Sequence, residues 1–319
     1  MSLRILLGIS MATVLAGCVL DTDGGEGDDE LAVDEATEAL LYANGKSLNG
    51  TSLNGTSLNG KSLNGKSLNG VSLNGKSLNG TALSGVALSA TNFSGMDGSK
   101  AVSSWVGATF TATLSDLSTV AVRIDSKTTL PAPNSDISAY GVSYQTTTGW
   151  APLCGVATTL AIPINGTFNY GSGVVGGGSF TPSSTAFTFA CRATAIAKCV
   201  ELGYKPWKTV GGVLLQNHMV ACTRMLRADF CGDGKPWTVD GTEINLYDGK
   251  GIQADGAAWI IEAEWNQNGA IRVNTSNTSR FQLNGGQPPA CYGPKTDKSH
   301  TGLLANFSTG TLLMNEYKQ

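Results

Sequence analysis

From residue 101 onward, apolar and polar positions follow the periods of regular secondary structure. Short runs rich in Val, Ile, Thr and aromatic residues predict β-strands. These runs occupy residues 105–114, 120–124, 137–145, 187–190, 238–247 and 259–265. Two other segments predict helices. Residues 193–202 are rich in alanine, and residues 214–230 place apolar residues three and four positions apart, at Leu215, Met219, Cys222, Met225 and Leu226. The pattern therefore predicts an α+β, β-rich domain over residues 101–319.

Residues 46–95 follow a different pattern, in which an apolar residue recurs every five positions. The segment divides into ten pentapeptides that begin as Lys-Ser-Leu-Asn-Gly and drift to Thr-Asn-Phe-Ser-Gly, so that the apolar position runs from Leu48 to Phe93. A period of five fits neither a helix nor a strand. The segment resembles the pentapeptide-repeat family. That resemblance implies a four-sided β-helix, with the Leu or Phe and the residue two before it facing inward.

Two structures for the repeat remain open, a short β-helix and a flexible stalk. The last three units fit the family best, with Thr81, Val86 and Thr91 two positions before the apolar residue. Earlier units place lysine there, and a buried, unpaired ammonium group is costly. Ten units would also give only about two and a half coils, close to the minimum for a solenoid. With either structure, the segment is expected to act as a spacer or an adhesive surface.

The N-terminal residues predict export and lipidation. Arg4 precedes a short apolar run over residues 5–15, which is too short to span a bilayer as a helix. The sequence Leu-Ala-Gly-Cys that ends at Cys18 closely resembles the bacterial lipobox. The resemblance implies a signal peptide over residues 1–17 that is cut before Cys18, and acyl chains on Cys18.

Residues 18–45 are expected to hold the lipidated cysteine and a disordered acidic tether. Residues 21–39 contain nine acidic side chains and no basic one. A short helix over residues 30–41 is the alternative. From residue 40 onward, 20 Lys and Arg stand against 15 Asp and Glu. That excess is too small for a typical nucleic-acid binder, so no nucleic-acid partner is predicted.

Six cysteines follow Cys18, all in the body of the chain. They are Cys154, Cys191, Cys199, Cys222, Cys231 and Cys291. An even number in an exported domain predicts three disulfides, but the sequence does not choose among the fifteen pairings. A zinc site with His218, Cys222 and Cys231 is the rival interpretation. No Cys-x-x-Cys pair supports it, so no metal is predicted.

The segment around Cys231 suggests a family. Residues 227–234 have the sequence Arg-Ala-Asp-Phe-Cys-Gly-Asp-Gly, and further similar segments lie at residues 189–191, 198–199, 203–207 and 221–224. Together these segments resemble the ADYC domain of lipoproteins from myxobacteria and their relatives, in which a Leu-Asn-Gly repeat often precedes the domain. Phe230 stands where the Ala-Asp-Tyr-Cys signature has tyrosine. The resemblance implies a domain assignment and no activity.

The candidate catalytic groups are sparse. His218 with Asp229 or Asp233 is the strongest combination for a hydrolase, but no Gly-x-Ser-x-Gly motif accompanies it. A calcium site over the acidic residues from Asp229 to Asp248, and a glycosidase pair at Glu262 and Glu264, are weaker alternatives. The chain has no phosphate-binding or dinucleotide fingerprint, so no cofactor is predicted.

The favoured function is therefore non-enzymatic. We expect a lipid-anchored extracytoplasmic protein, at the outer membrane or cell surface, that recognises a polysaccharide or an envelope protein. A hydrolase that uses His218 and a purely structural envelope protein are the alternatives. Most tryptophans should lie in the core, with one or two at a carbohydrate-binding face. They are Trp105, Trp150, Trp207, Trp237, Trp259 and Trp265.

Overall fold

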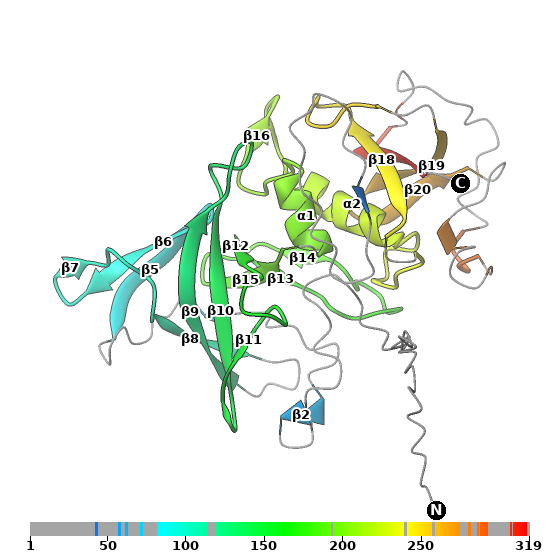
Figure 1. The fold of residues 1–319 in the computed structure, drawn as a ribbon. Helices are drawn as coiled ribbons and strands as arrows, with labels where there is room; N and C mark the ends of the chain where they lie inside the picture. The colour runs from blue at the N-terminus through cyan, green and yellow to red at the C-terminus, as the bar shows by residue number, and fades with distance from the viewer. Residues whose placement is uncertain are drawn as a thin grey trace, which may run out of the picture. The chain divides into compact units, whose positions relative to one another are not determined.

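Two antiparallel sheets enclose a pair of helices in the computed structural model (Figure 1). The structure describes residues 82–317, with gaps at 114–118, 193, 239–240, 257–258, 275–279, 282–285, 287, 293–306 and 308, and four two-residue strands before them. The predicted signal peptide, Cys18 and most of the predicted tether lie outside the described residues. None of the helices among the described residues is long and apolar enough to cross a membrane.

The larger sheet has seven strands and closes on itself. Its order is β11-β10-β12-β15-β4-β8-β9, and β9 also pairs with β10. The strands are β4 (Val71–Ser72), β8 (Thr109–Thr113), β9 (Thr119–Thr129), β10 (Ser138–Thr146), β11 (Gly149–Pro152), β12 (Ala161–Asn165) and β15 (Ala186–Cys191).

The second sheet has five strands in the order β1-β18-β21-β19-β20. They are β1 (Tyr42–Ala43), β18 (Glu243–Asp248), β19 (Ile260–Asn266), β20 (Gly269–Val273) and β21 (Leu313–Tyr317). Among the described residues, three two-stranded hairpins accompany these sheets. They are β2 (Ser57–Leu58) with β3 (Lys61–Ser62), β13 (Thr167–Phe168) with β14 (Phe180–Thr181), and β16 (Thr209–Val210) with β17 (Val213–Leu214).

Both faces of β10, β12 and β15 are buried, because each face contributes to a different hydrophobic core. Tyr140 and Phe187 face an aromatic core, whereas Ala139 and Ile162 face the helices. Double burial removes the alternation of apolar and polar residues that marks a half-exposed strand. This is why the sequence pattern misses β12.

Proline within β12 also conceals that strand from a sequence pattern. Gly166 N donates to Ala186 O, and Leu160 O accepts from Arg192 N, so the even-numbered residues bond to β15. The nitrogen of Pro163 therefore faces the other edge. There the pairing with β10 ends at Ala161, so Pro163 removes no ladder hydrogen bond.

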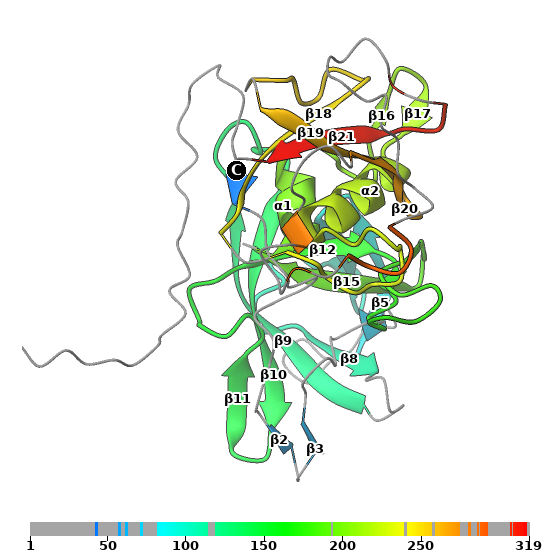
Figure 2. The ribbon, with the colours of Figure 1, turned by 90° about the vertical axis from the view of Figure 1, so that its right-hand side faces the viewer.

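The helices α1 (Ala195–Glu201) and α2 (Gln216–Arg227) confirm the two predicted helical segments with shorter bounds. Figure 2 shows them between the two sheets. Ten of the twelve residues of α2 are buried, including His218, Arg224 and Arg227. A helix buried on nearly all sides must find partners for its polar groups within the protein.

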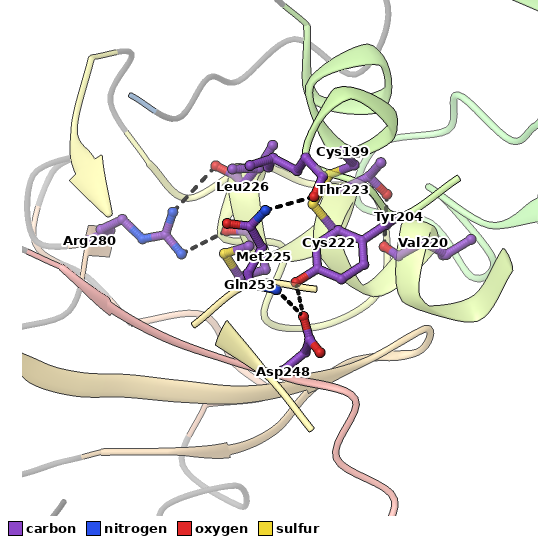
Figure 3. Close-up of a disulfide and its surroundings, with 11 residues drawn as sticks. Cys199, Tyr204, Val220, Cys222, Thr223, Met225, Leu226, Asp248, Gln253 and Arg280 are labelled. Carbon is purple, nitrogen blue, oxygen red and sulfur yellow. Dashed lines mark hydrogen bonds between the residues drawn. A yellow bond between two sulfur atoms is a disulfide. The ribbon is translucent and has the colours of Figure 1, made fainter. Parts of the chain in front are cut away.

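All six cysteines of the body form disulfides, as the sequence predicts. The structure decides the pairing, which is Cys154–Cys191, Cys199–Cys222 and Cys231–Cys291. The second bond joins α1 to α2 (Figure 3). Since Cys222 and Cys231 belong to different disulfides, neither thiolate is available for the zinc site that the sequence analysis weighed.

The last three repeat units form an antiparallel hairpin that packs on the body. The strand β5 (Leu83–Ser89) pairs with β6 (Asn92–Asp97), which pairs with β7 (Lys100–Ala101). A β-helix stacks parallel strands, so these described units do not follow its geometry. Leu83, Leu88 and Phe93 are buried in the aromatic core.

Phe93 is the centre of that aromatic core. Its ring centroid lies 5.1 to 5.4 Å from four other rings, which belong to Trp105, Phe110, Tyr140 and Phe187. Hydrogen bonds reinforce the attachment. The Thr91 hydroxyl accepts from Ser138 N (2.8 Å), and the Thr91 carbonyl oxygen accepts from the Tyr140 hydroxyl (2.9 Å). The repeat and the body therefore share one core.

We expect Phe93→Ala to lower the free energy of unfolding by about 3–5 kcal/mol, because it leaves a cavity among four rings. Met96→Ala is the matched control on the same hairpin, since Met96 is 37% exposed, and it should cost no more than about 0.5 kcal/mol. Urea unfolding followed by tryptophan fluorescence measures both. Equal effects would mean that the repeat does not share the core of the body.

Candidate functional site

The C-terminal end of α2 is buried, and each of its last four carbonyl groups has a partner. Such carbonyls lack partners within the helix and must find them elsewhere. Figure 3 shows the Arg280 guanidinium directed at two of them. Backbone donors bond to three of the four carbonyl groups, namely Asp229 N to Arg224 O (2.8 Å), Ala228 N to Met225 O (3.0 Å) and Trp237 N to Arg227 O (3.0 Å). Arg280 donates from Nη1 to Leu226 O (3.3 Å) and from Nη2 to Met225 O (2.7 Å).

Asp229, one of the candidate catalytic residues, follows this helix end and is fully buried. Its carboxylate accepts hydrogen bonds from Arg224 Nη1 (2.5 Å) and from the backbone N–H groups of Asp233 (3.1 Å) and Gly234 (3.0 Å). Burial raises the pKa of Asp229, and the guanidinium groups of Arg224 and Arg227 oppose that shift. The carboxylate thus organises the turn over residues 229–234.

A glycine-rich loop packs against this turn. A Cβ on Gly177 would overlap the carbonyl oxygen of Asp233, and a Cβ on Gly234 would overlap the carbonyl oxygen of Gly171. Only glycine permits this approach. Arg224 Nη1 also donates to Gly177 O (3.0 Å), and Arg227 Nη2 donates to Gly234 O (2.7 Å). Both arginines therefore hold backbone segments together.

Phe230 and Cys231 fix the other side of the turn. The buried Phe230 ring is stacked on Trp265 at 5.2 Å and meets Tyr292 edge-on at 5.3 Å. Cys231 is bonded to Cys291, next to Tyr292 in the chain. The segment from Ala228 to Cys231 therefore joins α2, the second sheet and a distant segment.

His218 lies in the first turn of α2, away from the aspartates. Its ring is stacked on Tyr204 with centroids 6.3 Å apart. Within the described part of the chain, its buried Nδ1 has no hydrogen-bond partner. Burial lowers the pKa of His218; Asp248 opposes this shift and Lys250 adds to it. The neutral imidazole is thus the favoured form.

The structure does not assemble the candidate catalytic groups. Arg227 lies nine positions after His218 in α2, or about 13.5 Å along the helix at 1.5 Å per residue, and Asp229 and Asp233 follow that end. Tyr204 packs on His218, and its hydroxyl donates to the Asp248 carboxylate (2.8 Å), as Figure 3 shows. The three residues therefore do not form a catalytic triad.

The other carboxylates that the sequence singles out are engaged in the core. Glu262 forms a fully buried ion pair with Arg280 (2.8 Å) and accepts from Asn315 Nδ2 (2.8 Å). Glu264 accepts from the Thr311 hydroxyl (2.5 Å). Among the described residues, no group of three or more His, Cys, Asp or Glu is placed to hold a metal ion. Asp240 lies outside those residues.

A separate cavity of about 460 Å³ opens at the N-terminal end of α2. The described residues that line it include no ionisable side chain. Its main polar and aromatic lining residues are Asn165, Phe180, Ser183, Ser184, Trp207 and Gln216. Cavities of this size with aromatic walls and a few polar groups commonly bind small ligands.

The family model of the ADYC domain matches residues 103–279, which is more than half of the chain. This chain belongs to the ADYC domain family. No curated protein and no solved structure matches the chain. In this ADYC domain the family signature lies at the buried C-terminal end of α2, where each residue makes structural contacts.

Sequence reasoning missed the cavity of the ADYC domain. Asn165, Phe180 and Gln216 come from the end of β12, from β14 and from the start of α2. Nothing in their local sequence links them. Trp207 gave the one available signal, as one of the six tryptophans considered for a binding face. The structure buries Trp105 and Trp265 and exposes Trp150.

We expect Asp229→Ala to lower the free energy of unfolding by about 3–5 kcal/mol, because Arg224 would remain buried without its carboxylate. Asp233→Ala is the control in the same turn. The Asp233 carboxylate accepts one bond near the surface, from Lys235 N (2.9 Å), so its loss should cost about 1 kcal/mol or less. Unfolding in guanidinium chloride compares the free energies of unfolding of the two variants. Similar small losses in both variants would contradict the structural role of Asp229.

The lowered pKa of His218 predicts that stability falls on acidification. Below pH 6.5, the usual pKa of a histidine side chain, the unfolded chain takes up a proton that the folded chain resists. The free energy of unfolding should therefore fall as the pH drops from about 6.5 toward the pKa of the folded state. Melting temperatures of wild type and His218→Gln over that range test this. The raised pKa of Glu316 acts in both proteins and cancels in the difference. A difference that does not change with pH would contradict the prediction.

Proposed function

We propose that this chain is a lipid-anchored extracytoplasmic protein that presents its ADYC domain to recognise an envelope or matrix polysaccharide. The observation that carries the proposal is a contrast between two parts of the domain. The ionisable residues that sequence analysis singles out for catalysis lie apart or take part in structural contacts. The cavity at the N-terminal end of α2 is open and lined by aromatic and neutral polar residues. That combination favours binding over hydrolysis.

Anchoring and location rest on the sequence around Cys18. A short apolar run that ends in Leu-Ala-Gly-Cys supports lipidation, and several acyl chains on one residue give stable membrane attachment. Three disulfides among six cysteines are typical of a protein that folds in an oxidising compartment. The acidic segment over residues 21–39 would then set the domain away from the membrane.

We expect Cys18→Ser to move the full chain from the membrane fraction to the soluble extracytoplasmic fraction, because the substitution removes the acylated sulfur. This soluble chain should then be retained by envelope material from the producing cells. Periodate, which cleaves vicinal diols of sugars, should abolish retention, and protease treatment of the envelope should leave it intact. Cell fractionation measures the move to the soluble fraction, and capture on treated and untreated envelope material measures the retention.

Each of the other outcomes supports an alternative to the proposed function. A Cys18→Ser chain that stays membrane-bound, with no lipid mass on the wild type, contradicts anchoring. Retention that survives periodate and is lost after protease treatment indicates an envelope protein as the partner. Absence of retention indicates a purely structural protein. Breakdown of envelope polymer that is lost in both His218→Ala and Asp233→Ala, while both variants stay folded by circular dichroism, indicates a hydrolase.

A further inference from the structure

Trp207 forms one wall of the cavity at the N-terminal end of α2, and the residues around it hold it in place. Asp136 accepts from Lys205 Nζ (2.5 Å) and pairs with Lys208 Nζ (2.9 Å). Tyr204, just before this segment, donates to Asp248. Trp207 therefore lies on a backbone segment that is anchored on both sides, so its ring needs little ordering when a ligand binds.

Phe180 forms a second aromatic wall, and a glycine permits its position. A Cβ on Gly166 would lie 2.5 Å from Phe180 Cζ, and Gly166 has φ +129°. The Phe180 ring also packs on Phe168, with centroids 4.8 Å apart. The ring is thus pressed against the backbone of the strand end that also carries Asn165.

Asn165 supplies an amide whose oxygen has no hydrogen-bond donor among the described residues. Its Nδ2 donates to Leu88 O (2.7 Å), which fixes the amide against the repeat hairpin. Its Oδ1 is buried and, among the residues that the structure describes, accepts no hydrogen bond. A buried acceptor without a donor is unfavourable, and Asn165 is one of the residues that line the cavity. Ser183, Ser184 and Gln216 add neutral polar groups around it.

We propose that this cavity binds a neutral saccharide, with a pyranose ring packed on Trp207 and sugar hydroxyl groups bonded to the Asn165 and Gln216 amides. The proposal rests on the proposed function and names the ligand class and its site. The C–H groups of a pyranose face carry partial positive charge and pack on the negative face of an indole. Amide and hydroxyl groups match sugar hydroxyls in both donor and acceptor roles. An acidic sugar would find no positive side chain among the described residues that line the cavity.

Calorimetric titration of the full chain that carries Cys18→Ser tests the proposal. The probes are neutral β-1,4-linked and α-1,4-linked glucose oligomers, an oligogalacturonate as the acidic counterpart, and a proline-rich peptide. We expect a neutral oligomer to bind and the oligogalacturonate to bind at least about tenfold more weakly. Trp207→Ala should weaken binding by about tenfold or more, and Trp207→Phe by less, because phenylalanine keeps an aromatic face.

Trp150→Ala is the matched control, since Trp150 is an exposed tryptophan outside the cavity. It should change the affinity by no more than about twofold. Circular dichroism checks the fold of each variant. If Trp207→Ala is unfolded, the comparison rests on Trp207→Phe and Gln216→Ala, each of which should weaken binding measurably.

The outcomes separate this inference from the proposed function. Saccharide binding that no cavity variant weakens overturns the site and leaves polysaccharide recognition standing. No binding of any neutral oligomer, with periodate-sensitive retention on envelope material, overturns the ligand class alone. Binding of the proline-rich peptide in place of the sugars overturns the inference in favour of a peptide site. Loss of retention on envelope material as well overturns the proposed function.

Discussion

The buried C-terminal end of α2 is the constraint on which much of the domain depends. The helix lies between two sheets, so water is not there to satisfy the carbonyl groups of its last turn. Two donors are the backbone N–H groups of Ala228 and Asp229, which directly follow the helix, and the others are the backbone of Trp237 and the side chain of Arg280. Because Trp237 and Arg280 lie further along the chain, their bonds to the helix end also fix the segments that carry them.

This constraint gives the ADYC signature a physical meaning. Ala228 ends the helix in the left-handed conformation, and Asp229 neutralises Arg224 while it bonds to the following turn. Phe230 packs on Trp265, and Cys231 is cross-linked to Cys291. Each of these four residues therefore contributes to the folded structure through its own contact or backbone conformation. Asp229, which the sequence analysis combined with His218 as a catalytic candidate, is here the partner of the buried Arg224.

The aromatic core links the repeat to the domain that follows it. The composition of the chain changes near residue 101, yet Phe93 lies among rings that come from β8, β10 and β15. The same hairpin positions the cavity, since Leu88 O receives the Asn165 amide. The end of the repeat is thus part of the proposed binding site as well as part of the core.

The sequence by itself determined the local structure and the chemistry of the cysteines. Periodicity located α1, α2 and most long strands, and an even cysteine count predicted three disulfides. Only the tertiary structure decided which cysteines pair, because pairing depends on contacts such as the one between α1 and α2. The tertiary structure also decided that His218 and Asp229 lie at opposite ends of one helix. It alone brought Asn165, Phe180 and Trp207 to one cavity. The physical reason is that spacing along the chain records local geometry, whereas a site built from distant segments is set by how sheets and helices pack.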